Sequence, residues 1–118
     1  MPTKKQPGDE VLEALDALCA ALDENVASAQ RIRKRAAVIK AEREKGLSYS
    51  EIVPAGEHPL IPELVSANLE RLFEAGSRLR RAEAKALHDE GLSMDAIGEL
   101  FGVTRQRVSA LLKPVRNS

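Results

Sequence analysis

Aromatic residues are almost absent from this sequence of 118 residues, which has no Trp, one Tyr and two Phe. Strands are enriched in aromatic and β-branched side chains, so a chain dominated by Ala and Leu instead predicts an all-α fold. The single cysteine, Cys19, excludes an intrachain disulfide framework and a cysteine-based zinc site. No apolar run approaches the roughly 20 residues of a membrane span, and the first ten residues lack the apolar stretch of a secretion signal. We therefore expect a cytoplasmic protein with no membrane partner.

Net charge is also lacking, since 18 basic side chains balance 18 acidic ones, but the charges are unevenly distributed. Residues 1–30 hold two basic and six acidic side chains, whereas residues 78–118 hold eight basic and five acidic ones. Such an asymmetry suits a protein whose C-terminal part faces phosphate groups. By itself it does not decide between DNA binding and other roles.

Two long amphipathic stretches dominate what is present. In the first, between Val11 and Ile39, side chains recur at alternating spacings of four and three, which is a heptad seam with one polar residue inside it. The candidate dimer-seam residues are Leu15, Leu18, Leu22, Asn25 and Ile32. In the second stretch, from Ile61 to Ala86, the spacing is less regular and predicts a helix packed within a domain.

The length of the first stretch leaves two alternatives. An unbroken helix over residues 9–45 would be about 55 Å long, far longer than a compact domain of this size. Either the helix breaks near residues 23–25 and Asn25 caps a second helix, or it projects as an arm and pairs with a partner. A single buried amide fixes the register of many coiled-coil dimers, and we therefore expect a homodimer.

A repeat relates the two stretches at a distance of 45 residues. "RAAVIKAEREKGLSYSEIV" (35–53) resembles "RRAEAKALHDEGLSMDAIG" (80–98), so both copies predict a long helix, a turn at Gly-Leu-Ser and a short helix capped by serine. The alternative is a chance match of a common connection. The first copy then runs into a proline-rich segment without Arg or Lys, and we interpret it as degenerate.

These observations divide the chain into four parts. We expect a disordered tail at residues 1–8 and a long helix with the degenerate helix-turn-helix-like unit at residues 9–61. A second long helix with a complete helix-turn-helix follows at residues 62–114, and a short tail at residues 115–118.

Residues 94–113, "MDAIGELFGVTRQRVSALLK", meet the positional demands of a DNA-binding helix-turn-helix. Gly98 supplies the small side chain required beneath a crossing helix, Gly102 tolerates the positive φ of the turn, and Thr104 is the expected N-cap of the second helix. The positions that two crossed helices bury are all apolar: Ile97, Phe101, Val103, Val108 and Leu111. The alternative is a trihelical packing unit that never contacts DNA.

The inward positions determine which side chains of the recognition helix, about residues 104–113, face outward. Arg105, Gln106 and Ser109 match the donor and acceptor edges of bases in a major groove. A second set is placed for phosphate contacts, with two members on the preceding helix: Thr104, Arg107, Lys113, Arg81 and Lys85.

The string "FGVTRQRVSALL" resembles the promoter-reading helix-turn-helix of bacterial sigma factors. The chain is also similar to small actinobacterial helix-turn-helix proteins with a helical extension ahead of the motif. The sigma-type resemblance covers about the last forty residues and implies DNA binding by a regulator or accessory factor. It does not imply a sigma factor, because nothing resembles the segments that grip core polymerase.

No catalytic constellation is visible: His58 and His88 have no neighbouring metal ligands, and no Gly-rich phosphate loop or paired nucleophile and base is present. We therefore expect no enzyme, no metal and no cofactor. The sequence predicts a nucleoid-associated transcriptional regulator that binds double-stranded DNA as a homodimer. Two alternatives remain open: a protein-interaction module that contacts RNA polymerase or a sigma factor or acts like an antitoxin, and a non-specific nucleoid-type DNA binder.

Overall fold

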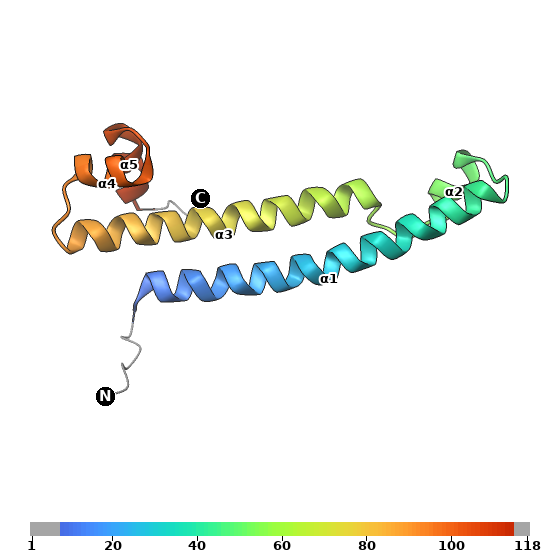
Figure 1. Cartoon of the computed structure of the whole chain (residues 1–118), viewed down its shortest axis with the longest axis horizontal. Helices are drawn as coiled ribbons and strands as arrows, with labels where there is room; N and C mark the ends of the chain where they lie inside the picture. Colours follow the sequence, from blue (N-terminus) through green and yellow to red (C-terminus); the bar gives the residue numbers. More distant parts are fainter. Residues whose placement is uncertain (1–7, 115–118) are drawn as a thin grey trace, which may run out of the picture. The chain divides into compact units, whose positions relative to one another are not determined.

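A computed structural model describes residues 8–114, and these residues form helices and connections without any strand. The all-α prediction is confirmed. The helices follow one another along the chain as coloured in Figure 1: α1 Glu10–Glu44, α2 Tyr49–Ala55, α3 Ile61–Asp89, α4 Met94–Phe101 and α5 Arg105–Leu112. Residues 1–7 of the tail expected to be disordered (1–8), and the short tail at 115–118, lie outside the described part of the chain.

The first helix is continuous. α1 comprises 35 residues, and Asn25 lies in its interior, so the alternative of a break near residues 23–25 is wrong. α3 is likewise continuous over 29 residues and passes through Gly76 and Ser77.

The chain divides into two compact units, each of which takes one segment from α1 and one from α3. We call residues 8–18 and 74–114 the C-terminal unit and residues 19–73 the hairpin unit. The units do not follow the expected division between residues 61 and 62, because α1 and α3 each contribute to both units. Each unit is described separately below.

The core of the C-terminal unit lies where α3, α4 and α5 meet. Its buried members are Ala84, Ile97, Val108 and Leu111. Five partly buried apolar side chains pack against them: Leu87, Leu92, Met94, Phe101 and Leu112. This small three-helix core fixes the position of α5, which carries the predicted DNA-reading residues.

In the hairpin unit, α1 and α3 run antiparallel and are joined by polar side chains. Asn25 Nδ2 donates to the Asn68 carbonyl oxygen (3.2 Å), and Asn68 Nδ2 donates to the Ser28 hydroxyl (2.9 Å). Arg71 Nη1 donates to both amide oxygens, at 2.9 Å for Asn25 and 3.1 Å for Asn68. Ser28 is buried, and buried polar groups are costly unless they are hydrogen-bonded, so this network holds the two helices in one register.

The α1 face that packs within the chain differs from the predicted dimer seam. Leu18, Asn25 and Ile32 are half-buried, but Leu15 and Leu22 are exposed. Small residues are buried in their place: Ala14, Ala21 and Ser28. The amide of Asn25, which we expected to meet a second copy, is bonded to α3 of its own chain.

The two copies of the repeat form matching turns. Gly46 has a φ of 97° and Gly91 a φ of 108°, a left-handed conformation that favours glycine. In both turns the glycine amide donates to the carbonyl three residues back, and the following leucine amide donates to the carbonyl five residues back. Ser48 and Ser93 then cap α2 and α4 with their side chains, as expected. The match thus extends from sequence to backbone geometry.

Candidate nucleic-acid interface

The turn between α4 and α5 brings the two helices into close contact at Gly98. A Cβ atom at this position would lie 2.8 Å from the Val103 carbonyl oxygen, so only glycine fits beneath the turn. The Val103 amide donates to the Gly98 carbonyl oxygen at 2.9 Å, which holds the two segments together. Gly102 has a φ of 70° and ends α4 in the left-handed conformation. The roles predicted for both glycines are therefore found.

Thr104 is the N-cap of α5. Its hydroxyl accepts a hydrogen bond from the Arg107 amide at 3.1 Å. Capping leaves the remaining amides of the first turn directed outward, where the positive end of the helix dipole favours an anion. This end of α5 is the one predicted to approach DNA.

Three of the five predicted core positions are buried in the motif: Ile97, Val108 and Leu111. Phe101 is half-buried, and the Arg80 guanidinium lies 4.2 Å above its ring, a cation–π contact that the sequence did not reveal. The burial predicted for Val103 is wrong. Its side chain is exposed because, in this turn, its carbonyl group and not its side chain faces Gly98.

The outward face of α5 carries Arg105, Gln106 and Arg107, all exposed. Ser109 is half-buried, so it is less available for base contact than predicted, and Ala110 is exposed instead. The reason is helical spacing: Ser109 lies one turn from Leu112, which packs against the core, whereas Ala110 lies on the face shared by Gln106 and Lys113.

Arg105 has an acidic neighbour that sequence reasoning missed. Its Nη1 lies 3.6 Å from Asp95 Oδ2, and both side chains are mostly exposed. An ion pair of this exposure contributes little to stability and is readily exchanged for another anion. It would hold the guanidinium near the N-terminus of α5 without preventing contact with a base or phosphate.

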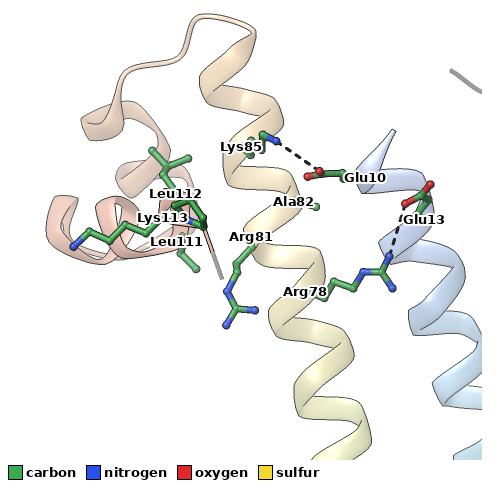
Figure 2. A pocket seen from close by; sticks show the side chains of 10 residues that line it. Glu10, Glu13, Arg78, Arg81, Ala82, Lys85, Leu111, Leu112 and Lys113 are labelled. Atoms are coloured by element: carbon green, nitrogen blue, oxygen red, sulfur yellow. Dashed lines mark ion pairs between the residues drawn. The ribbon is translucent and has the colours of Figure 1, made fainter. Parts of the chain in front are cut away.

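The other predicted phosphate-binding residues gather at the opposite end of α5. Arg81, Lys85 and Lys113 line one cleft of about 520 Å³, together with Leu111 and Leu112 (Figure 2). The cleft therefore lies on the inner side of α5, away from the N-terminal turn that carries Thr104 and Arg107. The structure brings the five predicted residues together as two clusters and not as one surface.

Acidic side chains from the start of α1 enter the same cleft. Lys85 Nζ lies 3.6 Å from Glu10 Oε1, and Arg78 Nη2 lies 3.9 Å from Glu13 Oε2, as the dashed lines in Figure 2 show. Arg81 and Lys113 form no ion pair within residues 8–114. A DNA phosphate would compete with a carboxylate at Lys85 but not at Arg81, so Arg81 and Lys113 are the more available cations.

Residues 8–114 contain no group of three or more His, Cys, Asp or Glu side chains that could hold a metal ion. Within the same residues, no helix combines the length and the apolar character needed to cross a membrane. His88 Nδ1 lies 3.3 Å from the Leu92 carbonyl oxygen, where it supports the turn before α4.

Comparison of the chain with models of protein families, with curated proteins and with solved structures gives no match.

Proposed function

We propose that this chain is a sequence-specific DNA-binding protein that regulates transcription. The observation that carries the proposal is the approach of α4 and α5 at Gly98, which leaves the capped end of α5 exposed with three polar side chains. α5 enters the major groove, where Arg105 reads guanine and Gln106 reads adenine. Arg107 and the Thr104 hydroxyl contact phosphates beside the groove.

The proposed active form is a homodimer. Each copy carries one recognition helix, and a dimer would present two of them to half-sites about 34 Å apart, one turn of the double helix. A (pseudo)palindromic site is therefore expected. Binding of this kind would place the protein in the nucleoid.

The test begins with selection of sites from a random DNA library, followed by affinity measurements on the selected site. Arg105→Ala and Gln106→Ala should each lose about 1–3 kcal/mol and relax the preference at one base position. Arg107→Ala should weaken all sequences equally and reduce the slope of affinity against salt by about 1. Arg31→Ala, which removes an exposed arginine of the hairpin unit, is the matched control and should bind normally.

Two results would contradict the proposal. Selection without any preferred sequence, combined with a steep salt dependence, would indicate non-specific nucleoid-type binding. Equal losses for Arg31→Ala and Arg105→Ala would show that α5 contributes charge alone.

A second candidate is a protein-interaction module that contacts RNA polymerase or a sigma factor or acts like an antitoxin. Large exposed apolar side chains in the hairpin unit, Leu69 and Phe73 above all, favour it. In that case the α4–α5 motif would be a structural unit. Partner binding through apolar helices would change little with salt, whereas DNA binding would weaken steeply.

A further inference from the structure

The hairpin unit has an exposed apolar face formed by both of its long helices. In α1, Leu22 is 47 % exposed and Val26 60 %. In α3, Val65 is 42 % exposed, Leu69 64 % and Phe73 75 %. We call these five residues the apolar face. Scattered exposed apolar residues are normal, but five large ones on one face of the hairpin unit need an explanation.

The five residues lie on the same side of the helix pair. Leu22 and Val26 directly follow Ala21 and Asn25, which pack against α3, and Leu69 directly follows Asn68, which packs against α1. A step of one residue turns a helix by about 100°. Because the two helices run antiparallel, the same step in both brings their side chains to the same side of the pair. Helical spacing aligns Val65 and Phe73 with Leu69.

The packing within the unit explains why this face is unpartnered. Where α1 meets α3, the buried side chains are small, Ala21 and Ser28, and polar groups occupy the middle of the contact. A two-helix layer of this kind buries little apolar surface and needs a second layer. The large side chains that would form a core are those of the apolar face.

The size of the face fits a partner of the same kind. With about 100 Å² for a fully exposed Val or Leu side chain and about 200 Å² for Phe, the apolar face presents about 350 Å². Two copies would bury about 700 Å² of it, and since apolar atoms supply about 60 % of an interface, the whole contact would reach about 1,200 Å². This is the size at which stable, specific interfaces begin.

We infer that a second copy of this chain packs on the apolar face, so that two hairpin units form a four-helix arrangement. A two-fold axis would set Leu69 and Phe73 of one copy against Leu22 and Val26 of the other, which is the self-complementary contact of a symmetric dimer. The inference is independent of DNA binding, because it concerns other residues.

The test is sedimentation equilibrium of the full chain, whose monomer mass is 12.9 kDa. The wild type should sediment at twice this mass, and Val26→Glu and Leu69→Glu should raise the dimer dissociation constant at least about 100-fold, because a symmetric dimer loses each contact twice. Two matched controls should remain dimeric. Val38→Glu changes a valine of α1 that is 55 % exposed but turned away from the apolar face, and Leu100→Glu changes a leucine of α4 that is 66 % exposed.

Cys19 provides a second readout. It is exposed in the single chain and directly follows the half-buried Leu18, so it lies on the same side of α1 as Leu22 and Val26. Alkylation of this thiol should slow as the wild-type concentration rises through the dimer dissociation constant. In Val26→Glu the rate should not depend on concentration. Circular dichroism checks that each variant keeps its helices.

Three results would overturn the inference: a wild-type chain that stays monomeric, a dimer that survives both glutamates, or equal dissociation by Val38→Glu. The wild-type monomer would assign the apolar face to a different protein. A dimer without any preferred DNA sequence would refute the proposed function and leave this inference standing. A monomer that reads DNA would overturn this inference and the proposed homodimer, and would leave sequence-specific DNA binding standing.

Discussion

Replacement of Gly98 by alanine probes the feature on which the functional proposal depends. The added Cβ would lie 2.8 Å from the Val103 carbonyl oxygen and 3.5 Å from Val108 Cγ2, and the first of these neighbours is backbone that cannot rotate away. Overpacking of this kind costs about 1–3 kcal/mol, whereas the better helix propensity of alanine returns about 1 kcal/mol. We expect Gly98→Ala to lower the free energy of unfolding, by up to about 2 kcal/mol. Separation of α4 from α5 should also weaken DNA binding.

Gly76→Ala is the control for this substitution. Gly76 lies inside α3, and a Cβ there would meet nothing within 4 Å. Only the propensity term remains, so Gly76→Ala should raise the free energy of unfolding by about 0.5–1 kcal/mol. Urea unfolding followed by circular dichroism should therefore move the two midpoints in opposite directions. A shift of both midpoints in the same direction would refute the close approach of α4 and α5.

Two further predictions concern single hydrogen-bonded side chains. Thr104→Ala removes the N-cap of α5 and should cost about 1 kcal/mol in urea unfolding, while Thr104→Ser should restore it. Equal stability of the two variants would mean that the cap does not form. Asn68→Ala removes the amide that donates to the buried Ser28 hydroxyl and one of the two acceptors of Arg71 Nη1, and it should cost about 1–3 kcal/mol. An unchanged midpoint for this variant would show that the network contributes nothing.

Local features of the fold were predictable from the sequence because they depend on neighbouring residues. A serine or threonine before a helix satisfies an amide three residues later, and this rule located the caps at Ser48, Ser93 and Thr104. Glycine in a turn relieves the strain of positive φ, and this rule located the turns at Gly46 and Gly91.

The packed face of α1 could not be chosen from sequence alone. Two heptad stripes lie side by side along the helix, one with Ala21 and Ser28 and the other with Leu22. Because leucine is the more apolar residue, the sequence pattern predicts burial of the stripe that contains Leu22. The structure buries the stripe of small residues, because α1 and α3 approach closely and exchange hydrogen bonds through Asn25 and Asn68. Partners 43 residues apart leave no local signal in the sequence.

The ion pairs of the candidate site could not be predicted either, because they too join residues of different helices. Arg105 and Lys85 were chosen by residue type and position, which the structure supports by leaving both exposed. Their partners, Asp95 and Glu10, come from other helices and depend on how those helices pack. The availability to a phosphate of a basic residue chosen from a motif is therefore a tertiary property.

The repeat explains why one copy alone ends in a helix suited to a groove. The two copies are offset by 45 residues, which aligns Val53 with Gly98 and Glu57 with Gly102. A helix cannot cross closely over Val53, because its side chain fills the space that Gly98 leaves open to the Val103 carbonyl group. Nor does the first copy offer a glycine for a left-handed turn at position 57. The two copies of the repeat thus begin alike and end differently. α2 ends at Ala55 and is followed by the proline-containing connection to α3, whereas α4 is capped by Gly102 and is followed by α5.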